Sequence, residues 1–131
     1  MPTSLTNLTS LAFLRLNNNQ LSSIIPRDIG RLSSLTILDL YENYLTGSIP
    51  ISLTNLTSLN TLDLSDNELS AIIPQDIGRL RSLTTFHVCG NNLIGLIPTS
   101  ICHMTNLTFL SVHANQLTGD IPKDIGKLRS L

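Results

Sequence analysis

The chain repeats itself every twenty-four residues along its whole length. Leucine recurs at this step from Leu11 to Leu131. Asparagine does the same from Asn19 to Asn115, and proline follows with an identical spacing. A constant period of this length is typical of a solenoid, in which each unit forms one coil and contacts only its neighbours. The spacing therefore predicts an elongated stack of coils.

We expect one repeat domain over residues 1–131. A partial leading repeat, residues 1–10, continues the register backwards, and Leu131 opens a further coil. The full coils are residues 11–34, 35–58, 59–82, 83–106 and 107–130. Solenoids usually carry polar caps at their ends. None is visible here, which predicts a segment of a longer array, or ends that are exposed or paired with another copy.

Each coil carries a fixed pattern of apolar residues. Counting its first leucine as coil position 0, apolar residues recur at positions 0, 3, 5, 10, 14, 18 and 21. Positions 3 and 5 alternate, as in a strand with one buried face. Positions 14, 18 and 21 suit a helical turn, and the proline at position 15 suits the first residue of that turn. The core must be aliphatic, because 41% of residues are hydrophobic but only 4% are aromatic.

One polar residue, the asparagine at coil position 8, recurs among these apolar columns. An amide side chain carries both donors and an acceptor, so it can satisfy backbone groups that turn away from water at the end of a strand. We therefore predict a buried, structural asparagine ladder made of Asn19, Asn43, Asn67, Asn91 and Asn115.

These residues form the leucine-rich repeat pattern LxxLxLxxNxL. The downstream part resembles the plant-type extracellular subclass, LxGxIPxxLGxLxx, as in LTGSIP at 45–50 and LTGDIP at 117–122. The resemblance implies an α/β solenoid, a right-handed superhelix with a concave parallel β-sheet and short helical or 3-10 turns on the convex side. It also implies kinship with the ectodomains of receptor-like kinases, receptor-like proteins and polygalacturonase-inhibitor-type defence proteins. Such repeats recognise peptides, small hormones or proteins outside the cell or at its surface.

A second period of forty-eight residues overlies the first. The turns PRDIGRL at 26–32, PQDIGRL at 74–80 and PKDIGKL at 122–128 match one another. The intervening turns, PISLTNL at 50–56 and PTSICHM at 98–104, are neutral. Charged and neutral coils therefore alternate on the convex side. The spacing within the charged turns also predicts weak ion pairs, between Asp28 and Arg31 and between Asp76 and Arg79.

The bulk properties exclude several partners. The net charge is −1, so neither nucleic acid nor an anionic membrane is indicated. The first residues lack the basic and apolar regions of a signal peptide, and no apolar run is long enough to span a membrane. We expect no cofactor and no membrane contact by this segment.

The concave strands present the variable residues of the repeat. We predict a ligand-binding face, against the alternative of an ordinary solvated sheet, and Tyr41 is its best single contact because tyrosine is enriched at binding hot spots. The predicted ligand-binding residues are Arg15, Asp39, Tyr41, Asp63, His87 and His113.

His87, Cys89 and His113 share this face, and their chemical interpretation is a metal site or a Cys–His nucleophile. No third orienting group accompanies them, and a small filler role for Cys89 is favoured. We therefore assign no catalytic residue and no metal. Cys89 and Cys102 fall on opposite sides of one coil, so we expect two free thiols.

Three sequons, at Asn7, Asn55 and Asn106, are possible glycosylation sites in a secreted protein, although composition alone accounts for about as many. A further departure from the plant-type pattern places Ile24, Ile72 and Leu96 on a lateral edge. This edge is either a contact surface for another protein, including homo-association, or local packing.

The sequence thus predicts a non-enzymatic module that binds a protein or peptide ligand. The alternative is a structural or self-assembling repeat array, natural or engineered, that associates through its uncapped ends. An enzyme is disfavoured, because the polar residues spread over a regular face instead of converging in a pocket.

Overall fold

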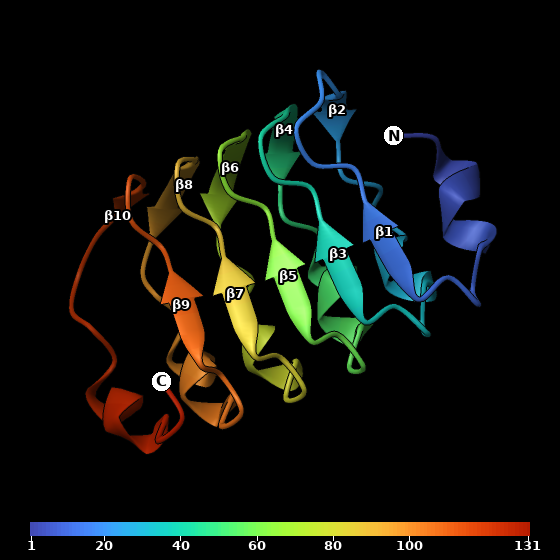
Figure 1. Ribbon diagram of the computed structural model, residues 1–131. Coiled ribbons are helices and arrows are strands. Elements are labelled where there is room, and N and C mark those ends of the chain that lie inside the picture. The colour runs from blue at the N-terminus through green and yellow to red at the C-terminus, as the bar shows by residue number, and fades with distance from the viewer.

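The computed structural model covers residues 1–131 and is a stack of coils with the two termini at opposite ends (Figure 1). Each full coil contains one strand, a connecting loop, a second strand and a 3-10 helix in that order. This architecture confirms the predicted leucine-rich repeat solenoid.

The first strands of the coils form a parallel sheet, sheet A. Paired residues lie twenty-four positions apart, as in the pairing of Leu38 with Leu62, so the sequence period sets the register. Sheet A runs in the order β1 (Phe13–Arg15), β3 (Ile37–Asp39), β5 (Thr61–Asp63), β7 (Thr85–His87) and β9 (Phe109–Ser111).

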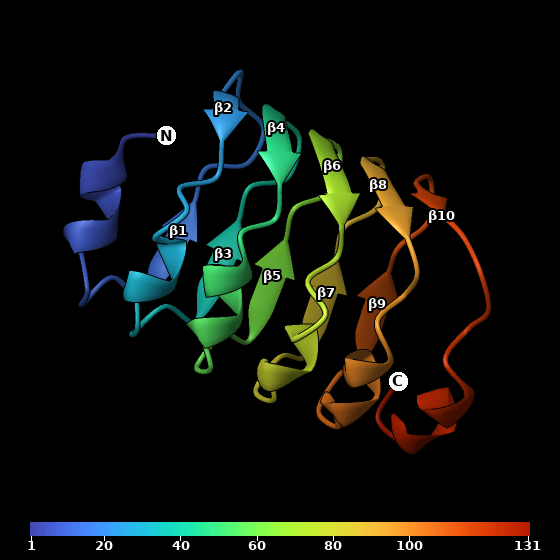
Figure 2. The ribbon, with the colours of Figure 1, turned by 180° about the vertical axis from the view of Figure 1, so that it is seen from behind.

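The second strands form another parallel sheet, sheet B, which Figure 2 shows from behind. Pairing here joins residues twenty-two apart, as in Ser70 with Asn92, so successive strands are staggered by two residues relative to sheet A. Sheet B consists of β2 (Ser22–Ile24), β4 (Tyr44–Ser48), β6 (Glu68–Ile72), β8 (Asn92–Gly95) and β10 (Gln116–Leu117).

Sheet B is a correction to the sequence analysis, which predicted a single sheet and only turns downstream of it. The alternation of apolar and polar residues that marks a strand is interrupted in this segment. Coil position 12 takes a positive φ in every coil, for example +79° at Gly47 and +68° at Ala71. Outward apolar residues such as Ile24 and Ile72 obscure the pattern further.

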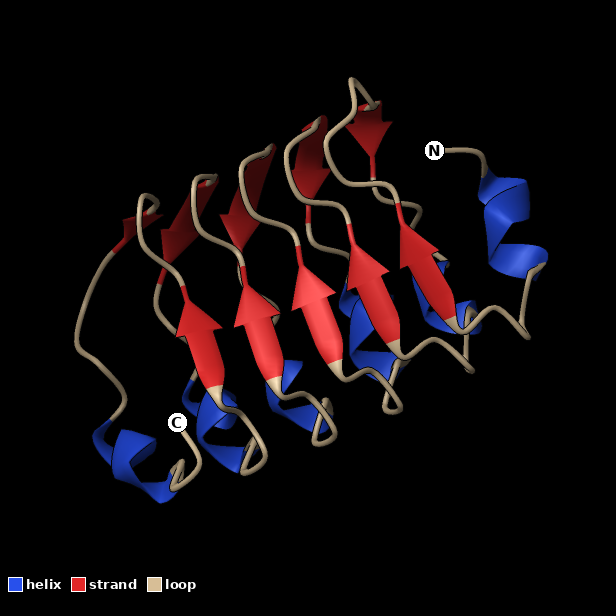
Figure 3. Cartoon of the chain, viewed as in Figure 1, coloured by secondary structure: helices blue, strands red, loops and turns tan.

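The third element of each coil is a short 3-10 helix on the side away from sheet A (Figure 3). These helices are η1 (Thr3–Asn7), η2 (Ile29–Arg31), η3 (Ile51–Asn55), η4 (Ile77–Arg79), η5 (Thr99–His103) and η6 (Lys123–Lys127). In four of them proline occupies the N-cap, one residue earlier than predicted. None of the helices combines the length and apolarity needed to cross a membrane.

The predicted ion pairs on these turns are wrong for the first two charged coils. Asp28 and Asp76 precede their helices as N-caps, and neither pairs with an arginine. In the last charged coil the helix begins earlier and includes both partners, so Asp124 and Lys127 approach to 2.9 Å. Both side chains are largely exposed, so the pair contributes little to stability.

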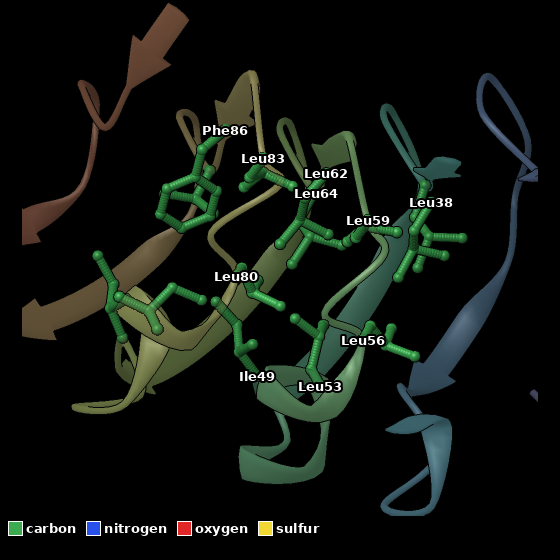
Figure 4. Close-up of a cluster of buried hydrophobic side chains, with 14 of the residues drawn as sticks. Leu38, Ile49, Leu53, Leu56, Leu59, Leu62, Leu64, Leu80, Leu83 and Phe86 are labelled. Atoms are coloured by element: carbon green, nitrogen blue, oxygen red, sulfur yellow. The ribbon is translucent and has the colours of Figure 1, made fainter. Parts of the chain in front are cut away.

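The aliphatic columns fill the space between the two sheets and the 3-10 helices (Figure 4). Each fully buried leucine or isoleucine contributes about 1.5–3 kcal/mol relative to an exposed one. In the third coil every predicted core position is completely buried: Leu59, Leu62, Leu64, Leu69, Ile73, Ile77 and Leu80.

The asparagines at coil position 8 lie where the strands of sheet A end. The Asn67 Nδ2 donates to the carbonyls of Leu40, Leu64 and Ser65 at 3.0, 3.2 and 2.9 Å. Its Oδ1 accepts the backbone N–H of Leu45 at 3.0 Å. One buried side chain therefore links sheet A of its own coil and of the preceding coil to the start of sheet B.

The same pattern of bonds recurs in neighbouring coils. Asn43 and Asn91 are also buried, and each makes the corresponding contacts to its own and the preceding coil. At the first coil Asn19 is exposed and bonds only within its own coil. Asn115 in the last full coil is partly exposed but keeps the complete set of partners.

Candidate ligand-binding face

The exposed side of sheet A, here called the sheet A face, carries side chains in rows that run from coil to coil. Register places Arg15, Asp39, Asp63, His87 and Ser111 in one row, because each is paired with the next across adjacent strands. Arg15 is exposed, and the other four are half-buried. The structure thus brings together four of the six residues predicted to bind a ligand.

Asp63 has the most polar contacts in this row. Its Oδ1 accepts the backbone N–H of Ser65 at 3.0 Å and the Ser65 hydroxyl. Its Oδ2 lies 3.3 Å from the Nδ1 of His87 on the next strand. The carboxylate is therefore held in a fixed orientation, and protonation of the imidazole would turn this contact into an ion pair.

Tyr41 lies two residues beyond Asp39 and is partly exposed on the same face. Its backbone N–H donates to the Asp39 Oδ1 at 3.2 Å. The negative charge of Glu42 raises the pKa of the Tyr41 phenol, and burial, Asp66 and Asp63 raise it further. The phenol is therefore a neutral donor in a region of negative potential.

Two exposed aromatic residues on this face were not predicted from the sequence. Phe13 and Phe109, on the first and last strands, are 58% and 64% exposed. The Arg15 guanidinium lies 5.6 Å from the centre of the Phe13 ring, within cation–π range. Phe13 and Phe109 each lie two residues before a member of the Arg15–Ser111 row. Because alternate residues of a strand share a face, this spacing could have placed them on the sheet A face.

A polar depression adjoins this face where the strands of sheet A end. Asn18, Glu42 and Asp66 occupy equivalent positions of successive coils and have φ values of +55°, +53° and +48°. The Asn18 side chain donates to the Glu42 carboxylate. The depression is lined by Asn18, Asn19, Gln20, Glu42, Asn43, Tyr44 and Asp66. We call it the acidic ledge.

His113, the sixth predicted residue, is exposed in the last full coil. Its Nδ1 lies 2.9 Å from the Ser111 hydroxyl, whereas His87 faces Asp63. The two imidazoles therefore have separate partners. The structure contains no group of three or more His, Cys, Asp or Glu side chains arranged to hold a metal ion.

The two cysteines are free and differ in environment. Cys102 is a buried residue of η5, and burial, followed by the charge of Asp124, raises the pKa of its thiol. We expect a disulfide-exchange reagent such as DTNB to label half-buried Cys89 at least tenfold faster than Cys102, since the thiolate is the reactive form. Cys89→Ser should remove the fast phase and leave the slow one. Equal rates for both thiols in the folded chain would contradict this assignment.

The lateral edge named in the sequence analysis lies on sheet B. Ile24 and Ile72 are about half exposed, and each reaches over a glycine of the following coil. A Cβ at Gly47 would lie 2.9 Å from the Ile24 Cγ2, and one at Gly95 would lie 3.1 Å from the Ile72 Cγ2. Leu96 covers Gly119 in the same way. The apolar residues therefore have a local packing partner.

The three sequon asparagines are all exposed but differ in their contacts. Asn7 and Asn55 end the equivalent helices η1 and η3, forty-eight residues apart. Asn106 instead lies in the turn before β9, where its Nδ2 donates to the Arg81 carbonyl of the preceding coil at 3.0 Å. Glycosylation at any of the three stays a prediction.

Solved structures of plant receptors share this architecture over the whole chain. The plant peptide hormone receptor RGFR1 in complex with RGF2 is 43% identical with a TM-score of 0.98, and this chain covers 21% of it. The PEPR1–AtPEP1 structure is 42% identical with a TM-score of 0.97 and 18% coverage. The Arabidopsis receptor kinase HAESA, in complex with the peptide hormone IDA and the co-receptor SERK1, is 39% identical with a TM-score of 0.92 and 22% coverage.

A curated relative is the leucine-rich repeat receptor-like serine/threonine-protein kinase RGI4 of Arabidopsis thaliana. It is 44% identical over 49 residues, which are 37% of this chain and 4% of that protein. The chain thus spans about a fifth of the receptor structures and a small part of this kinase. It corresponds to a non-catalytic ectodomain segment.

Family models agree with this similarity. Models described as leucine rich repeat match residues 10–32, 33–93 and 58–117. These matches cover well over half of the chain. The chain belongs to the leucine-rich repeat family, as a module similar to the ectodomains of plant receptor kinases.

Proposed function

We propose that this chain is an extracellular recognition module that binds an extended peptide across the sheet A face. The observation that carries the proposal is the unbroken row from Arg15 to Ser111, which presents different polar side chains on successive strands. Support comes from the receptors it resembles, two of which have peptide hormones named in their complexes.

The dimensions of the face suit a short peptide. Five strands about 4.8 Å apart span about 19 Å, which matches about six residues of an extended chain at about 3.3 Å each. Tyr41 near the centre offers a large contact area at low entropic cost, while Phe13 and Phe109 offer apolar contacts at the two ends. A peptide of this length would contact every coil.

The test is selection from a displayed library of random octapeptides on the purified chain, followed by calorimetry with the enriched sequences. We expect Tyr41→Ala combined with His87→Ala to weaken binding at least tenfold, because removing a hot-spot contact costs about 1.4 kcal/mol or more. Asp76→Ala combined with Arg79→Ala, on the opposite side, should change the affinity less than twofold. Failure to enrich any peptide, or equal loss in both variants, would contradict the proposal.

Self-association through the exposed Ile24, Ile72 and Leu96 edge is the alternative proposal. Sedimentation of the peptide-free chain over a hundredfold range of concentration separates the two. A monomer throughout supports the recognition module, and growth into larger species supports the array.

A further inference from the structure

The net charge of −1 hides a separation of charge between the two sides of the solenoid. Of the eight lysine and arginine residues, seven lie on the turns that contain the 3-10 helices. These seven are Arg27, Arg31, Arg79, Arg81, Lys123, Lys127 and Arg129. The turn side is therefore predominantly basic, with Asp28, Asp76 and Asp124 as its carboxylates.

The sheet A face and the acidic ledge carry the opposite charge. Asp39, Asp63, Glu42 and Asp66 lie there on two successive coils, and Arg15 on β1 is the sole arginine or lysine. Arg15 lies over Phe13 and makes no ion pair with any of these carboxylates. The central part of the face therefore lacks a permanent cation of its own.

Register makes this arrangement unfavourable within the isolated chain. Asp39 and Asp63 are paired directly across adjacent strands, where like charges are destabilising. The Asp39 Oδ1 accepts a backbone N–H, while its Oδ2 has no hydrogen-bond partner. Such a departure from the usual rules of strand pairing is expected at functional sites, where an external group provides the compensation.

The Tyr41 side chain, which neighbours these carboxylates, experiences the same negative potential. The pKa of the Tyr41 phenol is raised, first by Glu42 and also by Asp66 and Asp63. Three carboxylates from two coils therefore act on one point of the face. A guanidinium carries five N–H donors in a planar fork and can donate to two carboxylates at once.

We propose that the peptide ligand of the sheet A face is cationic, with an arginine or lysine side chain placed between Asp39 and Asp63. This inference rests on the proposed function and specifies the chemistry of its ligand. Apolar residues on either side of the cation would reach Phe13 and Phe109, which lie two coils away from β5 in each direction. The class of ligand is therefore a short basic peptide with apolar ends.

The experiment uses the octapeptides enriched on the parent chain and compares their net charge with that of the unselected library. We expect enrichment of arginine and lysine, with affinity falling at least fivefold between 50 and 300 mM salt. Asp39→Asn combined with Asp63→Asn should weaken binding at least tenfold. Asp28→Asn combined with Asp76→Asn removes the same charge from the turn side and should leave the affinity within twofold.

The outcomes separate this inference from the proposed function. Enriched peptides that are neutral or acidic, yet depend on Tyr41 and His87, would overturn the inference and leave the function standing. Peptides whose affinity is unchanged by both the Tyr41/His87 and the Asp39/Asp63 substitutions would overturn the inference and the proposed function. Thermal melting of Asp39→Asn provides a check that does not depend on a ligand. We expect a higher melting temperature, because the like-charge pair is relieved, and a lower one would count against the inference.

Discussion

Replacing Asn67 by leucine should lower the free energy of unfolding by about 4 kcal/mol. The Leu45 N–H has the Asn67 Oδ1 as its hydrogen-bond acceptor and lies in a fully buried residue, so it would be left unpaired. The carbonyls of Leu40, Leu64 and Ser65 would each lose one donor. A loss of this size is a large fraction of the stability of a small domain. Urea denaturation followed by circular dichroism measures it.

The matched control is Asn19→Leu in the first coil. Asn19 is exposed and donates only to the carbonyls of Leu16 and Asn17, and no backbone N–H bonds to its side-chain oxygen. We expect a loss below about 1 kcal/mol, since exposed groups can bond to water instead. Equal destabilisation by the two substitutions would show that the ladder does not act through buried backbone groups.

The sequence predicted those features of the fold that are repeated and buried. The aliphatic columns and the position 8 asparagines recur in every coil, so their spacing alone indicated the core and sheet A. Sheet B was missed because a residue with a positive φ interrupts the alternation of its strands, and this residue is glycine at Gly47 but alanine at Ala71. Alanine there gave no indication of a positive φ.

The candidate face was predicted in outline for a similar reason. Alternation within a strand and a step of twenty-four between strands suffice to place Asp39, Asp63 and His87 in one row. The contact between Asp63 and His87 depends on side-chain orientation, which a spacing does not specify. Phe13 and Phe109 were not predicted, because alternation along a strand sets the face of an aromatic residue but not whether its side chain stays exposed there.

The forty-eight-residue period has a physical cause in the packing of neighbouring turns. In the charged coils a glycine, Gly30 or Gly78, lies against the backbone of a serine in the next neutral coil. The Gly78 N–H donates to the Ser100 hydroxyl at 3.2 Å, and that hydroxyl donates to the Gln75 carbonyl at 2.6 Å. Ser52 makes the same pair of contacts to the first charged coil. Each charged coil with this glycine therefore packs closely against the neutral coil that follows it, which carries the serine.

Replacing Gly78 by alanine should disrupt this close packing at a cost of about 3 kcal/mol. A Cβ there would lie 2.0 Å from the Ser100 carbonyl oxygen and 2.6 Å from its carbon, so backbone would have to move. Gly126 occupies the equivalent position of the last coil, and a Cβ added there meets nothing within 4 Å. Gly126→Ala should leave stability unchanged or raise it by up to about 1 kcal/mol, because alanine restricts the unfolded chain. A urea midpoint that falls for Gly78→Ala but not for Gly126→Ala would establish that contact with the following serine-containing coil requires glycine. Equal shifts of the two midpoints would show that the destabilisation arises within the turn itself.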